Sequence, residues 1–559
     1  MLKTWLKIAW RQLQKNRLFG TVNIVGLAIG LTVSLLLFLY VRHESSFDSY
    51  HSNGKNIYRL VFNAQMDDQS ARWAGCPNIA GPTFKSELSE IREMSRWIRN
   101  DFGQSANVLY KNNKFFEPNL YWADSSLTHI FDIPFVKGNP ATALTRPKTI
   151  IINETIAKKY FANEDPIGKV LKLNNKLDCE VTGVFKDFPG NSTLDAELIG
   201  SFYSVEWMNR LMWGNASFET FLLLTDNTDI KKTETKLATI VDKHVKKEDQ
   251  WFSFNLQSLS DIHLYSSDIK SYSSRPGDLK QVKILSLLAL AIIIIACINY
   301  MNLATARSQN RFRETGISKT MGATTLSLIG RFYIETSLFV ILSVLASVLL
   351  LLIAMPLFNS LTNLQLSIAD LANSKILIAV GAVIVVMTLL SGSYPAFYLA
   401  RFNPKNLFHQ TFSKRNIAGR LRQSLVVIQF SASVILIIAT FLFFRQLEYI
   451  QSKELGYQPN QVVAVTSTAA ENADQLNAML NEARGQANVT SVCRTQTFPG
   501  RGGSGRSISR PGDENGLPMT TCRATNGIIK TLSLPLLAGT DLPADKLSTD
   551  LYGDRKSVV

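Results

Sequence analysis

The glycine-rich run 500–507 is the stretch of this chain closest to a chemical motif. Glycines at such spacing can wrap backbone N–H groups around a phosphate, and a lysine then reaches the outer phosphates. Here Arg506 stands in the place of that lysine, and Pro499 precedes the run where an apolar strand should lead into it. We therefore interpret 500–507 as a surface loop that binds no nucleotide.

Two pairs of titratable side chains are also incomplete as sites. His43 and Glu44 lack the second histidine of a zinc-binding HExxH helix. Asp261 and His263 could belong to a hydrolase, but no GxSxG turn supplies a nucleophile. The sequence therefore predicts no catalytic residue, no cofactor and no metal ligand, and we do not expect an enzyme.

The distribution of charge indicates a membrane protein. The 559 residues are 46% apolar, with a mean hydropathy of +0.06 and a formal net charge of +15. Sixteen Lys or Arg residues and one acid, Glu314, lie in 1–18, 307–332 and 400–422, so these segments hold the whole net charge. Basic segments beside apolar runs stay in the cytoplasm by the positive-inside rule, which explains the charge better than binding to nucleic acid does.

The apolar runs predict an α-helical transmembrane bundle of five spans with mixed α/β extracytoplasmic domains. Each run is long enough to cross about 30 Å of hydrocarbon. The predicted segments are a cytoplasmic basic amphipathic helix at the membrane surface, 1–18; a span, 19–41; an external domain, 42–281; a span, 282–306; a cytoplasmic segment, 307–331; a span, 332–356; an external loop without Lys or Arg, 357–374; a span, 375–399; a cytoplasmic basic linker, 400–422; a span, 423–444; and a second, incomplete external domain, 445–559.

Hydrophobic periodicity predicts the elements of the external domains. Strands are expected at 57–62, 149–152, 179–185 and 461–465, and helices at 154–161 and 470–484.

The five cysteines include no CxxC pair, so we expect free buried thiols. A bridge between Cys76 and Cys179, or between Cys493 and Cys522, stays open because sequence cannot establish proximity.

An internal repeat links the two external domains. Residues 124–138 align without gaps to 525–539 and match Gly138 with Gly539. The chain is therefore predicted to hold one full unit and the beginning of a second. Because 554–559 resembles a translated sequencing adapter, we expect a truncated reading frame.

Two features inside the spans have roles that stay open. Glu335, four residues after Arg331, can form an interfacial ion pair or serve packing or gating. Gly26 and Gly30 have GxxxG spacing, which alone is a weak signal for close helix packing.

The charged segment 311–323 lies between two apolar runs and has the composition of a short amphipathic helix. Ile317 and Met321 fall on one face, and the helix is predicted to end at Gly322 and Ala323. It could dock on a soluble partner, or it could be a solvated loop whose basic residues only fix the orientation of the chain.

The same segment, read as Arg-Glu-x-Gly-Ile-x-Lys-x-x-Gly-Ala from residue 313, resembles the coupling segment of FtsX/MacB-type ABC transporter permeases. Ser318 departs from the commoner Gly-Ile-Arg-Lys, which leaves the strength of the contact open. Other stretches similar to the family, in matching order and spacing, are 44–51, 57–59, 157–161, 165–169, 181–184, 187–189, 299–302, 394–396 and 455–457.

The resemblance implies a permease of the long two-unit form, paired with a separate cytoplasmic ABC ATPase subunit that binds the ATP. The external domain would be a MacB-type periplasmic core domain, in a multi-pass protein of the bacterial inner membrane with a cytoplasmic N-terminus. The residues that would couple to the ATPase are Arg311, Arg313, Glu314, Gly316, Ile317, Lys319, Gly322 and Ala323.

Two functions follow from the resemblance. In the first, ATP hydrolysis drives export or a mechanical rearrangement of the periplasmic domains. In the second, an FtsX-like scaffold activates a periplasmic partner without transport. Besides the ATPase and the lipid bilayer, the candidate partners are a second permease copy or homologue and a periplasmic membrane-fusion protein or hydrolase; nucleic acid is not expected.

Overall fold

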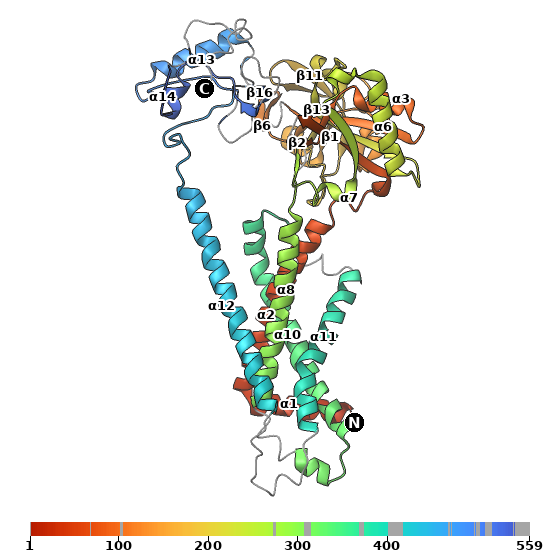
Figure 1. The fold of residues 1–559 in the computed structure, drawn as a ribbon, viewed down its shortest axis with the longest axis vertical. Helices are drawn as coiled ribbons and strands as arrows, with labels where there is room; N and C mark the ends of the chain where they lie inside the picture. The colour runs from red at the N-terminus through yellow and green to blue at the C-terminus, as the bar shows by residue number, and fades with distance from the viewer. Residues whose placement is uncertain are drawn as a thin grey trace. The chain divides into compact units, whose positions relative to one another are not determined.

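The chain forms two compact units in the computed structural model (Figure 1). The helical unit comprises Met1–Phe47 and Asp278–Ile450, and the second unit comprises Asp48–Gly277 and Gln451–Val559. The structure describes residues 2–66, 69–100, 104–271, 276–306, 315–367, 374–400, 417–467, 470, 472–496, 498, 504–508, 517–539 and 542.

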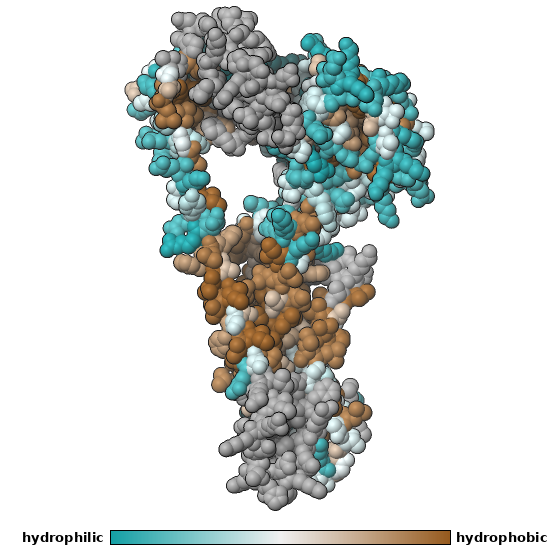
Figure 2. Space-filling view, viewed as in Figure 1, coloured by the Kyte–Doolittle hydropathy of each residue, from teal (hydrophilic) through white to brown (hydrophobic). Residues whose placement is uncertain are grey.

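Among the described residues, the helical unit contains, besides a short helix over 315–320, a short N-terminal helix and five long helices. They are α1 (Leu2–Lys15), α2 (Arg17–Ser45), α8 (Leu279–Ala306), α10 (Thr325–Thr362), α11 (Ser374–Ala400) and α12 (Ile417–Ser452). Within the described residues, α2, α8, α10 and the part Gln423–Ser452 of α12 are long and apolar enough to cross a membrane, and α11 contains a shorter apolar stretch, Val380–Ser393. Figure 2 shows apolar residues gathered over these helices.

Helix α10 is longer than the apolar run predicts, because it begins at Thr325 and passes through Pro356 to Thr362. Residues 357–362, which we expected to begin an external loop, are therefore helical. A proline inside a membrane helix is tolerated where neighbouring groups compensate for the lost hydrogen bond. The ring of Phe358 packs edge-on against Tyr40 of α2 at 6.5 Å between centroids, so tertiary contact continues beyond the proline.

Close backbone approach joins α2 to α8. A methyl group added to Gly30 would lie 2.9 Å from the Cβ of Ala296, and one added to Gly26 would lie 3.6 Å from the Asn299 amide. Small residues let helices pack at this distance. The Gly26 and Gly30 spacing therefore has a packing role.

A sheet of fifteen strands forms the main part of the second unit among the described residues. The main path runs β15-β2-β1-β13-β4-β7-β12-β9-β11-β10-β5-β6, while β14, β3 and β8 pair with β1, β13 and β11. The strands are β1 (Ile57–Met66), β2 (Gln69–Trp73), β3 (Gly75–Pro77), β4 (Ile91–Arg99), β5 (Ala106–Tyr110), β6 (Asn113–Glu117), β7 (Leu120–Ala123), β8 (Phe135–Gly138), β9 (Thr149–Asn153), β10 (Val170–Leu173), β11 (Leu177–Phe185), β12 (Leu198–Ser201), β13 (Ala216–Leu224), β14 (Phe252–Ser258) and β15 (Ile269–Lys270). We call residues 48–277 the sheet domain.

Short helices cover the sheet and confirm its mixed α/β class. They are α3 (Ala80–Glu87), α4 (Leu127–Ile130), α5 (Glu154–Phe161), α6 (Ile230–His244) and α7 (Leu259–Ile262). The helix predicted at 154–161 is α5, which begins there because the Asn153 side chain accepts a hydrogen bond from the Ile156 N–H. The strands predicted at 57–62, 149–152 and 179–185 lie in β1, β9 and β11.

Residues from 451 onward contain α13 (Ala473–Gly485), the hairpin β16 (Ser504–Ile508) and β17 (Leu517–Thr521), and α14 (Ile528–Leu532). The strand predicted at 461–465 is wrong: this stretch is irregular, and Val463 and Val465 are exposed instead of packed on a sheet. The interpretation of 500–507 as a loop is wrong for 504–507, which pair with β17.

The internal repeat has a structural counterpart. Helices α4 and α14 begin at the aligned positions Leu127 and Ile528. Gly138 and Gly539, also aligned, both adopt left-handed backbone conformations, with φ of +87° and +90°. Glycine adopts such angles without steric cost, so the repeat preserves a backbone shape as well as a residue.

All five cysteines are free thiols. Cys76, Cys179 and Cys297 are buried, as expected, but Cys522 is exposed and Cys493 is half-buried. The expectation of burial is therefore wrong for Cys522.

Candidate functional site

The described part of the predicted coupling segment is a short helix over 315–320 that is closed by a turn. Gly316, Ile317 and Lys319 lie in the helix, whereas Gly322 and Ala323 lie in the turn. The N–H of Ala323 donates to the Ser318 carbonyl at 2.9 Å, and Gly322 has φ +94°. A left-handed glycine is a common end of a helix, so the predicted end is confirmed. Arg311, Arg313 and Glu314 lie outside the described residues.

The segment is joined to α10 almost without a linker. Thr324 follows Ala323 directly and caps α10, accepting a hydrogen bond from the Ser327 N–H at 3.3 Å. The helix 315–320 and α10 are therefore separated only by the turn and its capping residue. A force applied to the short helix would reach α10 through four residues.

Apolar side chains of this segment point away from the protein. Ile317 is 56% exposed and Met321 is 84% exposed, while Thr315 is buried. The pair at four-residue spacing lies on one helix face, as predicted. These two exposed apolar side chains are available for contact with another molecule.

Glu335 is buried inside the helical unit, with 7% of its surface exposed. The next residue, Thr336, accepts a hydrogen bond from the Tyr300 hydroxyl of α8 at 3.3 Å. A carboxylate buried in this way needs a polar partner, so an ion pair with Arg331 and a packing or gating role both stay open for Glu335. Its pairing with Arg331 stays a prediction.

Asp48, three residues after α2, holds the start of the sheet domain to Asn191 and Thr193, which lie far along the chain. We call this group of contacts the first anchor. Asp48 is buried with φ +57°, a conformation that Asp and Asn adopt more readily than most residues. Its carboxylate accepts hydrogen bonds from the Thr193 N–H at 2.8 Å and from the Thr193 hydroxyl. Its own N–H donates to the Asn191 carbonyl at 2.9 Å.

His51 adds a further contact to the first anchor. Its Nδ1 accepts a hydrogen bond from the Asp132 N–H at 3.1 Å, so Nε2 carries the proton of the neutral ring. Burial lowers the pKa of His51 to about 4, against the opposing effect of the Asp132 charge. Burial also raises the pKa of Asp48, while its hydrogen bonds to Thr193 act in the opposite direction. Because its pKa lies well below 7, His51 is neutral at neutral pH.

A second anchor lies at the other end of the sheet domain. Gly277, the residue before the helical unit resumes, donates its N–H to the His263 carbonyl at 2.8 Å. His263 follows α7 directly and is buried, and its charge would lower the pKa of Asp48. Gly277 is therefore held to the residue that directly follows α7.

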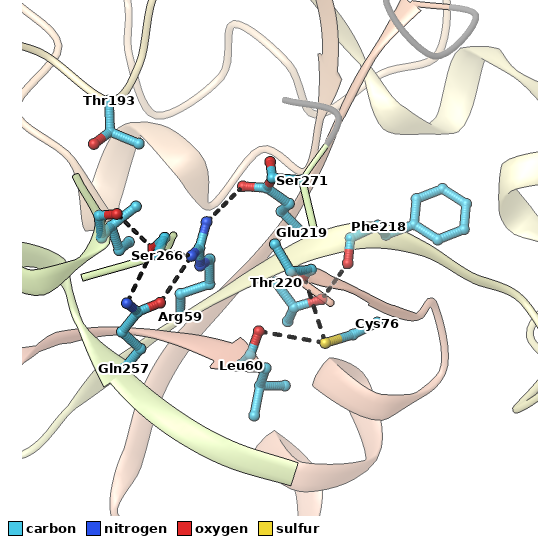
Figure 3. A network of polar contacts seen from close by, with 12 residues as sticks. Arg59, Leu60, Cys76, Thr193, Phe218, Glu219, Thr220, Gln257, Ser266 and Ser271 are labelled. Atoms are coloured by element: carbon cyan, nitrogen blue, oxygen red, sulfur yellow. Dashed lines mark hydrogen bonds and ion pairs between the residues drawn. The ribbon is translucent and has the colours of Figure 1, made fainter. Parts of the chain in front are cut away.

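A buried polar network around Arg59 connects the sheet to Ser266, which lies shortly after α7 (Figure 3). Arg59 of β1 donates to Gln257 of β14 at 2.8 Å and to the Ser266 hydroxyl at 3.0 Å. Ser266 in turn donates to the carbonyl of Ile262 at the end of α7. The Arg59 guanidinium also lies 3.6 Å from the Glu219 carboxylate of β13. Arg59 thereby links three strands to the turn that holds Gly277.

Asp48, His51 and Arg59 lie in the stretches 44–51 and 57–59 that resemble the family, but the sequence predicted no role for them. A charged residue inside the apolar run Ile57–Met66 was the available signal, because a buried arginine needs partners. The partners could not be found, because Thr193 and Glu219 lie more than 140 residues away along the chain.

The rejected motifs have ordinary surroundings. His43 and Glu44 belong to the last turn of α2, and Asp261 accepts a hydrogen bond from the Ser258 hydroxyl at 2.8 Å within the α7 turn. In the described part of the chain, no three His, Cys, Asp or Glu side chains group as metal ligands would.

Two family models match the chain. The MacB-like periplasmic core domain matches residues 21–240, and the FtsX-like permease C-terminal domain matches residues 286–404. The first match contains most of α2 and most of the sheet domain, and the second contains residues 311–323, the predicted coupling segment.

Curated relatives agree with these matches. The chain is 23% identical over 349 residues to the macrolide export ATP-binding/permease protein MacB of Aggregatibacter actinomycetemcomitans, covering 60% of this chain and 50% of the relative. It is 24% identical over 263 residues to the uncharacterized ABC transporter permease YknZ of Bacillus subtilis, covering 47% of this chain and 60% of the relative. The chain thus spans about half the length of the curated relatives it matches.

A solved structure, the periplasmic region of MacB from Actinobacillus actinomycetemcomitans, is 19% identical and covers 37% of this chain and 91% of that chain with a TM-score of 0.28. The family assignment rests on the sequence matches. The chain is an FtsX/MacB-like ABC transporter permease with a MacB-like periplasmic core domain and an FtsX-like permease domain.

Proposed function

We propose that this permease couples ATP hydrolysis by a separate cytoplasmic ATPase to movement of its periplasmic core domain, and that residues 311–323 make the contact. The observation that carries the proposal is the exposure of Ile317 and Met321 on a helix that leads directly into α10. The ATPase binds the nucleotide, and this chain binds no cofactor. The charged residues of this segment in the sequence, Arg311, Arg313, Glu314 and Lys319, are proposed to contribute to the contact.

Movement passes from α10 to both helices that lead to the core domain. The Thr32 hydroxyl of α2 lies 3.3 Å from the Ser347 carbonyl of α10, and the Ser34 hydroxyl donates to the Ala289 carbonyl of α8 at 3.0 Å. Such contacts inside a bundle make α2, α8 and α10 move together. The first anchor then receives the motion from α2 and the second from α8.

The proposed setting is the bacterial inner membrane, with the basic segments and the N-terminus in the cytoplasm. Export is the proposed outcome of the movement, and the names of the MacB relatives support it. A second permease copy or homologue and a periplasmic membrane-fusion protein are the further partners that we propose.

The test replaces the apolar contact and measures ATPase stimulation. Ile317→Ser with Met321→Ser is expected to lower the stimulation of the co-reconstituted ATPase by roughly tenfold, the size of losing one strong interface contact. The control is Leu211→Ser with Met212→Ser, which removes another exposed apolar pair, 53% and 46% exposed, from the sheet domain.

Reversing the charges with Arg313→Glu and Glu314→Arg tests the remaining part of the segment. Membrane insertion should survive in all three variants, because none changes a span. Normal stimulation in both coupling variants would contradict the proposed role of 311–323.

A further inference from the structure

Helix α1 has one face packed on the helical unit. Ala9 is buried, with 4% of its surface exposed. A methyl group added to Gly330 of α10 would lie 3.3 Å from the Trp5 ring, and one added to Gly20 of α2 would lie 3.3 Å from Leu13. Trp5 therefore rests directly on α10, five residues after that helix begins.

The opposite face of α1 is basic and exposed. The residues on it are Lys3, Leu6, Lys7, Trp10, Arg11, Gln14 and Lys15. Leu6 and Trp10 are 40% and 48% exposed, and residues 1–18 contain no acid. Among the residues that the structure describes, no carboxylate pairs with these four cations.

The short connection to α2 determines the depth of α1 relative to the membrane. A single residue, Asn16, separates the two helices, and Figure 1 shows α1 running crosswise to α2. The Asn16 N–H donates to the Gln12 carbonyl at 3.2 Å, and the Gly20 N–H donates to the Asn16 carbonyl at 3.0 Å. Because α2 is a membrane span, a helix joined crosswise to its first turn lies in the headgroup layer.

We propose that the exposed face of α1 binds the headgroups of anionic phospholipids. Lys3, Lys7, Arg11 and Lys15 would lie at the phosphates, and their aliphatic stems would follow the apolar surface. Leu6 and Trp10 would enter the boundary with the acyl chains, where an indole ring is favourable. An acidic protein surface fits less well, because it would leave Leu6 and Trp10 without an apolar environment.

Lipid bound to α1 would also restrain α10, the helix that follows the predicted coupling segment. Since Trp5 is seated on Gly330, lipid that holds α1 also holds the first turns of α10. The inference does not depend on an ATPase partner, and it can hold or fail separately from the role of 311–323.

The test measures how well brominated lipids quench Trp10. The full chain is reconstituted in phosphatidylcholine vesicles that contain either brominated phosphatidylglycerol or brominated phosphatidylcholine at equal fraction. The signal of Trp10 is the fluorescence that Trp10→Phe removes. We expect a preference for the anionic lipid of at least about fivefold, which a single basic residue near an anionic surface can supply. We also expect 1 M salt to lower it, where the screening length is only about 3 Å.

The variant Lys3→Gln, Lys7→Gln, Arg11→Gln and Lys15→Gln should show no preference. Its control removes four exposed lysines of the sheet domain, Lys231, Lys232, Lys246 and Lys247, and should keep the preference. Equal quenching by both lipids in the unmodified chain would overturn the proposal, as would absence of Trp10 quenching, which means that protein covers the face. If the variant fails to insert, the salt dependence of the unmodified chain decides the question.

Discussion

Arg59 and Glu219 face each other across neighbouring strands of the core domain, with Nη1 of Arg59 3.6 Å from Oε2 of Glu219. Both side chains are almost fully shielded from solvent. Because a buried charge is stable only when paired and hydrogen-bonded, the two residues depend on each other.

We predict that Arg59→Met lowers the free energy of unfolding by about 3–5 kcal/mol, since it leaves the Glu219 carboxylate buried without its cation. Urea unfolding of the full chain in detergent, followed by tryptophan fluorescence, measures this, because six of the eight tryptophans lie in the sheet domain. The control Arg72→Met breaks an exposed ion pair with Asp268 and should cost less than about 1 kcal/mol. Equal losses in the two variants would contradict the prediction, and Arg59→Met with Glu219→Leu should recover part of the loss.

Protonation of His51 should destabilise the core domain below pH 6.5. Its pKa is about 4 in the folded protein and 6.5 as the ordinary value, so the folded state binds fewer protons between these limits. The contribution of His51 is therefore complete above pH 6.5 and is lost as the pH falls towards 4, by roughly 3 kcal/mol. Asp48 acts in the opposite direction, because its raised pKa makes its contribution decrease as the pH rises through that pKa.

The effect of His51 is isolated by comparison with His51→Gln, which cannot titrate but can still accept a hydrogen bond from the Asp132 N–H. Unfolding free energies at pH 7, 5.5 and 4 should converge for the two proteins as the pH falls. Parallel pH profiles would show that His51 does not titrate in this window.

Gly30→Ala should loosen the packing of α2 on α8. Its methyl group would lie 2.9 Å from the Cβ of Ala296, closer than such atoms approach, and we expect a loss of about 1–3 kcal/mol from overpacking. Thermal unfolding in detergent checks this, with Gly381→Ala as the control because nothing lies within 4 Å of a methyl group there. Adding Ala296→Gly to the variant should restore stability, and failure to do so would place the cause elsewhere.

Features that depend only on residues close to each other along the chain could be predicted from the sequence. Apolar length and charge located the long helices, because a membrane span must satisfy its backbone internally whatever its neighbours are. Helix α5 lies over the predicted residues 154–161, and Gly322 ends the short helix of the predicted coupling segment as expected, since helix periodicity and caps act within a few residues.

Features that depend on contacts between distant residues were decided only by the tertiary structure. Phe358, which follows Pro356 in α10, packs on Tyr40 of α2. Thr193 donates a hydrogen bond to Asp48, which lies 145 residues earlier in the chain. Local sequence contains no record of such partners. The sequence by itself therefore determined the class of protein and its long apolar helices, whereas the tertiary structure decided how Asp48, Arg59 and Gly277 anchor the sheet domain, because each of these residues is held by groups far from it along the chain.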